Sequence, residues 1–377
     1  MTEKKKQLEV YLTSGCVGIY CFMLMFYCGL NSWIRDVLQI NPSIFSIVAL
    51  VFLLSKIAIT KYNFKEMVMI AIGMVIAGLN LLNTRDVTVL TNIIVICSVK
   101  NVNMEKALKW MFWGGVFVTG LVILTSLSGG MPPIALTQDF GREVGIETRY
   151  CLGFYHPNHL HWQIVQVALL AIAADFHKLD WKMVSLFAAI NIGAYMLTGS
   201  RTGLICGMAL CVIVMFYRMA VNVINMRIWK IAEMIVGLVL VGFSFLSAWC
   251  YKGTGLLAEL NSLLNNRIII ANNYVNTIEL SWWGYPGYSS ITTENGYIRM
   301  LFGLGIVPCV VLICLELLLL LWALRNNRSE VRIVVLLTLA YGFMEPIGFL
   351  KVFKNIAFLY VGMMMFDKMS LDLIADK

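Results

Sequence analysis

The chain has 377 residues, of which 60% are hydrophobic and 13% are charged. Soluble domains carry about twice that charged fraction, and apolar runs of nearly span length recur along the whole chain. This composition excludes a soluble protein and predicts an all-α polytopic membrane protein. The net charge of +8 does not indicate a nucleic-acid partner, because the basic residues gather in alternate loops.

We expect one integral membrane domain over residues 1–377, with about twelve transmembrane helices. The predicted spans are Tyr11–Leu30, Ser43–Ile59, Met67–Leu82, Val87–Val99, Trp110–Leu127, His159–Phe176, Met183–Leu197, Gly203–Tyr217, Ile231–Cys250, Gly296–Leu321, Ile333–Leu350 and Val352–Phe366. The fourth and the twelfth are short for a bilayer crossing, which takes about 20 residues. The last two could instead form a re-entrant pair.

Lys and Arg are found in every second connection, from Lys4–Lys6 at the start to Arg325–Arg332 near the end. Cytoplasmic loops are rich in these residues, so we expect both termini in the cytoplasm. The two longest connections, Ser128–Pro157 and Tyr251–Asn295, then lie outside. They are too long for simple connectors, and such loops usually carry function. In the second, Leu256–Leu264 and Ile268–Ile278 predict short amphipathic helices.

The first of three polar motifs on the outer side surrounds Pro157, which lacks a backbone N–H and suits the first turn of a helix. The residue before a proline is disfavoured in helical geometry, so His156 should be the last extended residue. His156 and Asn158 then lie at a helix N-terminus, which attracts anions. Arg149 could add a planar, permanently charged guanidinium. An ordinary polar helix cap explains the same residues about equally well.

The other two motifs also precede predicted spans. In Leu197–Gly203, Ser200 is a good N-cap and Arg201 falls at the start of the eighth span. In Thr293–Gly296, Glu294 and Asn295 open the tenth span. A capping role for Glu294 is favoured over a catalytic one. Three positive helix ends on one side would suit a doubly negative group.

Arginine outnumbers lysine in the outer segments, whereas lysine dominates inside. A guanidinium grips phosphate in a bidentate manner, and lysine acts as a point charge. The alternative is surface pairing with nearby acids. The outer arginines are Arg142, Arg149, Arg201 and Arg267, and the acids are Glu143, Glu147 and Glu259.

No metal or other cofactor is expected. His156, His159 and His161 cluster outside, but their spacing does not place all three rings on one helical face. The ten cysteines form no Cys-x-x-Cys pair, so neither a zinc site nor a disulfide framework is indicated.

Taken together, the motifs resemble the Wzy-type polymerases of bacterial capsule and O-antigen repeat units. The resemblance runs from about Arg142 to Leu304, and the first five spans add little. The segments that carry it are Leu152-Gly-Phe-Tyr-His-Pro-Asn158, Thr198-Gly-Ser-Arg-Thr-Gly203, Leu264-Asn-Asn-Arg-Ile268 and Glu294-Asn-Gly-Tyr297. Their order and predicted topological side agree with the family as well.

The resemblance implies an inverting, metal-independent, GT-C-like glycosyltransferase on the outer face of the bacterial cytoplasmic membrane. It would move a growing glycan from undecaprenyl pyrophosphate to the non-reducing end of a new lipid-linked repeat, beside a flippase and a chain-length regulator. The catalytic residues would be Arg201, His156 and Glu294, and either of the last two could be the base. Substrate binding would involve Arg149, Arg267, Asn158, Ser200, Asn295, Arg142 and Tyr297.

Two alternatives stay open. The related O-antigen ligases place a functional histidine in the large late outer loop, and Tyr251–Asn295 contains none, which favours a polymerase over a ligase. A flippase for lipid-linked oligosaccharides should carry charges within its spans and no long outer segment. This chain shows the opposite pattern.

Overall fold

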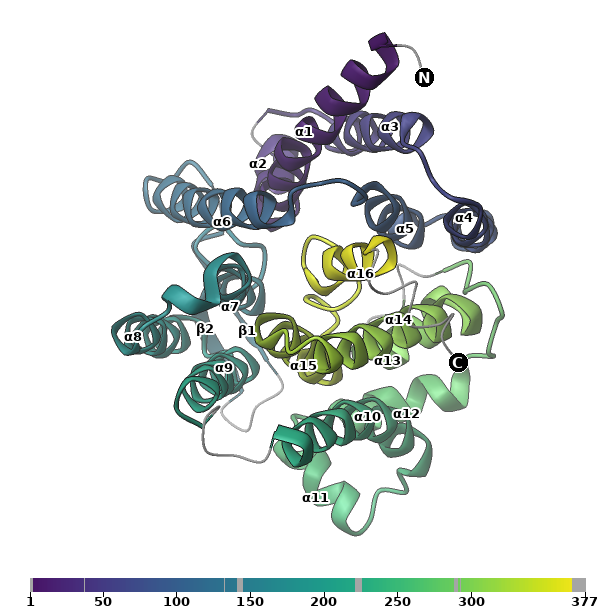
Figure 1. Cartoon of the computed structure of the whole chain (residues 1–377). Coiled ribbons are helices and arrows are strands. Elements are labelled where there is room, and N and C mark those ends of the chain that lie inside the picture. Colours follow the sequence, from purple (N-terminus) through teal and green to yellow (C-terminus); the bar gives the residue numbers. More distant parts are fainter. Residues whose placement is uncertain are drawn as a thin grey trace. The chain divides into compact units, whose positions relative to one another are not determined.

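The computed structural model describes residues 3–36, 38–131, 133–140, 145–220, 226–287, 291 and 293–367. The chain is 76% helical, and an all-α protein is confirmed. It divides into two compact units, and the elements of each are labelled in Figure 1. Unit 1 comprises Met1–Lys61 and Ser98–Asn222, and unit 2 comprises Tyr62–Cys97 and Val223–Lys377.

Unit 1 contains the first two polar motifs, which surround Pro157 and Ser200. Its elements are α1 (Glu3–Met25), the π-helical turn η1 (Phe26–Leu30), α2 (Asn31–Asp36), α3 (Ser43–Ile59), α6 (Met104–Leu127), β1 (Ala135–Asp139), β2 (Ile146–Tyr150), α7 (Pro157–Asp175), the 3-10 turn η2 (Phe176–Lys178), α8 (Trp181–Thr198) and α9 (Arg201–Ala220). Helix α6 packs on α1 and α7, and α8 packs on α7 and α9. A Cβ at Gly114 would lie 2.5 Å from Cys21 Sγ, so α1 and α6 approach closely at that glycine.

Unit 2 contains the third motif. Its elements are α4 (Phe64–Thr84), α5 (Thr88–Ser98), α10 (Met226–Cys250), α11 (Leu256–Leu263), α12 (Arg267–Thr277), α13 (Gly296–Arg299), the π-helical turn η4 (Met300–Leu304), α14 (Ile306–Arg325), α15 (Ser329–Met344) and α16 (Ala357–Phe366). One buried apolar cluster joins α10 and α12 to the α13–η4 segment through Ala248, Ala271, Ile298 and Phe302. This packing fixes helix α12 against the start of the tenth predicted span.

Within the described residues, six helices are long and apolar enough to cross a membrane. They are α1 with η1, α4, α6, α9, α10 and α14. The chain therefore has the helices of a multi-pass membrane protein. The other six predicted spans also coincide with helices, but α3, α5 and α16 are apolar and shorter. The number of crossings and the orientation stay predictions.

The tenth span was predicted as one helix, Gly296–Leu321, and the structure breaks it at Gly305. This residue has φ of +95°, and a Cβ there would lie 2.2 Å from the Gly284 nitrogen. The carbonyls of Ser281 and Trp282 accept the first two N–H groups of α14 at 2.9 and 3.1 Å. The preceding loop thus satisfies the free N–H groups of the new helix end, which explains why a break is tolerated here.

A buried segment without helix separates α15 from α16. The Asn92 side chain satisfies its backbone on both sides, because Nδ2 donates to Leu350 O at 2.8 Å and Oδ1 accepts from Val352 N–H at 3.0 Å. Asn355 Nδ2 donates to Phe349 O at 3.0 Å and to Glu316 at 2.6 Å. Non-helical backbone at membrane depth requires such partners. The eleventh and twelfth predicted spans are accordingly shorter than expected.

The two long outer segments contain regular structure. Helices α11 and α12 confirm the two amphipathic helices predicted in Tyr251–Asn295. Ser128–Pro157 contains an antiparallel β-hairpin that was not predicted, in which Leu136 pairs with Arg149. The sequence signal for this hairpin was the alternation of side-chain types over residues 146–150. The prediction did not use that signal. The hairpin fixes the position of Arg149 in unit 1.

The orientation can be tested by cysteine labelling in a variant without native cysteines. Ser262 on α11 and Lys61 before α4 are both exposed. We expect a membrane-impermeant maleimide to label Ser262→Cys in intact cells and Lys61→Cys only after permeabilisation, because basic loops stay inside. The reverse pattern would contradict the predicted topology.

Candidate functional site

The start of α7 follows the prediction from Pro157. His156 is extended, with φ of −151° and ψ of 146°, and its Nδ1 accepts the Asn158 N–H at 3.1 Å. In a neutral imidazole whose Nδ1 accepts, the proton is on Nε2. In this tautomer Nε2–H is a hydrogen-bond donor, which weighs against His156 as a general base.

The start of α9 also follows its prediction. Ser200 Oγ accepts the Gly203 N–H at 3.3 Å, and Arg201 is the first helical residue. The preceding Gly199 has φ of +60° and ends α8. Arg201 is exposed, and within the part of the chain that the structure describes its side chain makes no hydrogen bond or ion pair. Its charge is therefore not compensated by a partner there.

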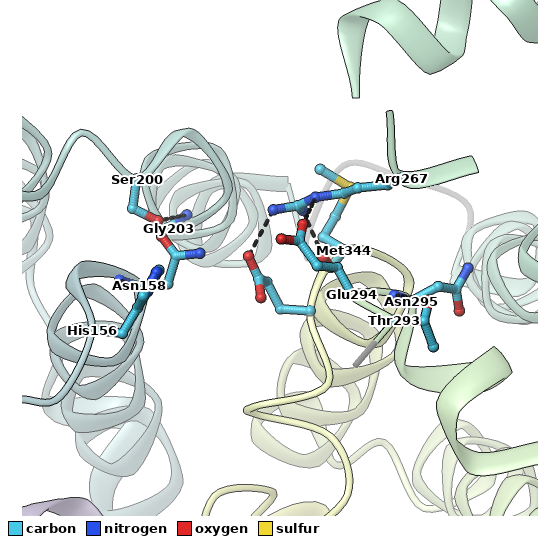
Figure 2. Close-up of polar contacts among 10 residues, drawn as sticks. His156, Asn158, Ser200, Gly203, Arg267, Thr293, Glu294, Asn295 and Met344 are labelled. Atoms are coloured by element: carbon cyan, nitrogen blue, oxygen red, sulfur yellow. Dashed lines mark hydrogen bonds and ion pairs between the residues drawn. The ribbon is translucent and has the colours of Figure 1, made fainter. Parts of the chain in front are cut away.

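The fully buried His161 holds these two helix starts side by side. Its ring nitrogens lie 3.0 Å from Thr198 Oγ1 and 2.8 Å from Asn191 Oδ1. A Cβ at Gly203 would lie 2.3 Å from the ring, so only glycine allows this approach. Figure 2 shows His156 and Asn158 beside Ser200 and Gly203. No such packing role was predicted for His161.

Arg149 lies against the same turn. It is 6% exposed, its guanidinium carbon is 4.0 Å from the centre of the Phe140 ring, and one terminal nitrogen pairs with Glu147. Among the residues that the structure describes, its buried Nε has no hydrogen-bond partner, and it would lie 3.1 Å from a Cβ at Gly199. A buried charged N–H without a partner is costly. A ligand oxygen that reached this N–H would remove that cost.

We call these residues of unit 1 the anion cluster: Arg149, His156, Asn158, Ser200 and Arg201. It combines two helix N-termini with two guanidinium groups, one of them exposed. The alternative to ligand binding was pairing of the arginines with nearby acids. It applies in part, because Glu147 pairs with Arg149. Arg142 belonged to the predicted site but lies outside the described residues.

Arg267 in unit 2 has a different environment. Its side chain is 11% exposed, it donates to Met344 O at 2.6 Å, and it pairs with Glu345 at 2.7 Å and Glu294 at 2.6 Å (Figure 2). Burial alone would lower the pKa of Arg267, but the charges of Glu345 and Glu294 outweigh it and raise that pKa. Two carboxylates around one guanidinium repel phosphate. Arg267 thus belongs to an ion-pair network within unit 2, and its predicted substrate contact stays a prediction.

The third motif caps its helix through Asn295, not through Glu294 as favoured. Asn295 Oδ1 accepts the N–H groups of Tyr297 and Ile298 at 3.0 and 3.1 Å. Glu294 is instead 44% exposed and paired with Arg267. The amide side chain of Asn295 is shorter than the side chain of Glu294 and fits the capping position. The Glu294 carboxylate is therefore left accessible.

Tyr297 was predicted to bind substrate, and this role stays a prediction. The residue is fully buried, its hydroxyl donates to Leu339 O at 2.9 Å, and its ring lies 4.5 Å from that of Phe349. In this structure its side chain is therefore packed inside unit 2.

Among the residues that the structure describes, no three His, Cys, Asp or Glu side chains are grouped so that they could hold a metal ion. The metal-independence implied by the resemblance stays a prediction. No model of a known protein family matches the chain, and the searches of curated proteins and of solved structures found no match either.

The Arg267 network predicts a stability effect. Removing one partner of a buried ion pair leaves an uncompensated charge and costs about 3–5 kcal/mol. We expect Arg267→Ala to lower the free energy of unfolding of purified protein by that amount, and Lys252→Ala, at an exposed cation of the same segment, to change it little.

The double variant Arg267→Met with Glu345→Leu should regain much of the loss, because no buried charge is left unpaired. An Arg267→Ala protein that unfolds like the wild type would contradict the structural role.

Proposed function

We propose that the chain is a polymerase that joins undecaprenyl-pyrophosphate-linked oligosaccharide repeat units into a surface polysaccharide. It would act on the outer face of the bacterial cytoplasmic membrane, as the resemblance to Wzy-type polymerases implies. The observation that supports this most is the anion cluster. Two helix starts side by side and a buried guanidinium with an unused N–H suit a pyrophosphate.

In the proposed reaction, a hydroxyl oxygen of the acceptor sugar attacks the anomeric carbon of the growing chain. The bond from that carbon to the pyrophosphate oxygen breaks, its electron pair leaves with the lipid pyrophosphate, and the configuration inverts. The hydroxyl proton passes to a base. Negative charge grows on the leaving group, so donors fixed in advance by the fold stabilise the transition state more than the bound substrate.

Arg149, Arg201 and the positive ends of the α7 and α9 helix dipoles would stabilise the leaving pyrophosphate. His156, whose Nδ1 accepts the Asn158 N–H, would lie beside that group. Glu294, which lies in unit 2 and whose side chain is 44% exposed, stays the other candidate for the base.

An O-antigen-ligase-like transferase and a flippase would also bind a lipid pyrophosphate, so the product must discriminate between them. Cells that lack the protein should accumulate one lipid-linked repeat unit if it is a polymerase. Finished polymer that stays on the lipid pyrophosphate would indicate a ligase. Failure of any lipid-linked repeat to reach the outer face would indicate a flippase. Either of these last outcomes would contradict the proposal.

We expect Arg201→Ala to reduce polymer formation by about a hundredfold or more, because removing one transition-state donor typically has that effect. Arg201→Lys should also be poor, since it keeps the charge but loses the bidentate geometry. The matched control is Arg218→Ala, which removes an exposed arginine near the other end of α9. Polymer yield and length are measured at equal membrane levels of each variant. Wild-type polymer from Arg201→Ala would refute the role of the anion cluster.

A further inference from the structure

An apolar crevice lies between α6, α7, α8 and α9 of unit 1. Its volume is about 350 Å³, which is within the range of small-molecule sites. Val165, Ala168 and Leu210 form a buried floor, whereas Trp113, Leu186 and Ile190 line it with 65%, 51% and 44% of their surface exposed. The crevice is therefore a groove with a closed floor and an accessible rim.

The few polar groups in the lining are already used within the protein. Thr119 Oγ1 accepts from Gln163 and donates to Gly115 O. Asn191 Oδ1 faces His161, and its Nδ2 donates to Leu204 O at 3.0 Å. Apart from the indole N–H of the exposed Trp113, the lining is apolar or already hydrogen-bonded, and its chemistry favours an apolar chain.

One side-chain network links the groove to the anion cluster. Asn191 belongs to the lining and also to the His161–Thr198 network that holds the two helix starts together. On α7 the lining begins at Ile164, and on α9 at Gly207. With a rise of 1.5 Å per residue, it begins about 9–11 Å along each helix from its start. An amphiphile with an anionic head at the cluster would extend its chain into the groove.

We infer that this groove binds the isoprenoid chain of the lipid pyrophosphate. This inference rests on the proposed function and extends it by assigning a separate site to the lipid part of the substrate. A single groove below a single anion cluster fits one chain on a pyrophosphate head. A phospholipid would bring two chains to a groove that receives one.

The test compares two pyrophosphates that share a head and differ in chain length. Isopentenyl pyrophosphate carries one isoprene unit, and farnesyl pyrophosphate carries three. Purified full-length protein should bind the farnesyl compound at least about tenfold more tightly, because each buried methylene contributes about 0.8 kcal/mol and tenfold corresponds to 1.4 kcal/mol. Ile190→Trp fills the groove and should remove this advantage. The affinity for isopentenyl pyrophosphate should stay unchanged.

Ile192→Trp is the matched control, because Ile192 is on the same helix and 41% exposed but does not line the groove. Comparison of Ile190→Trp with this control also corrects for partitioning of farnesyl pyrophosphate into detergent, which affects both variants equally. Val116→Trp blocks the groove from α6 if Ile190→Trp does not fold. Groove-filling variants that keep the full chain-length advantage would overturn the inference and leave the anion site intact. A phospholipid that copurifies with the wild type and is lost from Ile190→Trp would identify a different occupant and contradict it.

If isopentenyl pyrophosphate binds neither the wild type nor Ile192→Trp, the anion site itself fails. That outcome would overturn the proposed function together with this inference, and it is distinguishable from loss of the chain-length effect alone.

Discussion

The contact between His161 of α7 and the Thr198 end of α8 is the constraint on which the candidate site depends. One imidazole bonds to Thr198 and Asn191, and Gly203 of α9 packs directly on its ring. These interactions place two helix N-termini side by side. Parallel helix dipoles repel one another, so an arrangement with both positive ends together requires such fixed packing. An anion between those ends would relieve the repulsion, which gives the geometry a physical reason.

Arg149 and Arg267 show how similar residues acquire different surroundings. Among the described residues, Arg149 pairs with one carboxylate and its Nε–H has no partner beside the turn before Ser200. Arg267 is bonded to a carbonyl and to the carboxylates of Glu294 and Glu345. Charge balance therefore favours Arg149 over Arg267 for the proposed anion binding. Sequence alone could not separate them, because their partners are distant along the chain or on a hairpin.

Local rules predicted the helix starts well. Pro157 and Ser200 determine their own backbone geometry through steric effects and a single side-chain acceptor, so no tertiary information was needed. The break at Gly305 and the burial of Tyr297 were not predictable in the same way. Both depend on packing between segments: the loop at Gly284 covers the break, and Phe349 covers the ring. Hydropathy shows only that such residues are apolar or flexible. It does not show which surface packs against them.

The central claim is that the anion cluster of unit 1 binds a lipid pyrophosphate. An experimental structure of the protein with a polyprenyl pyrophosphate tests it most directly. The account predicts phosphate oxygens at the starts of α7 and α9 and within hydrogen-bonding distance, about 3 Å, of Arg149 Nε and of the Arg201 guanidinium. A pyrophosphate bound elsewhere, with the Arg149 Nε–H still unpartnered, would contradict it.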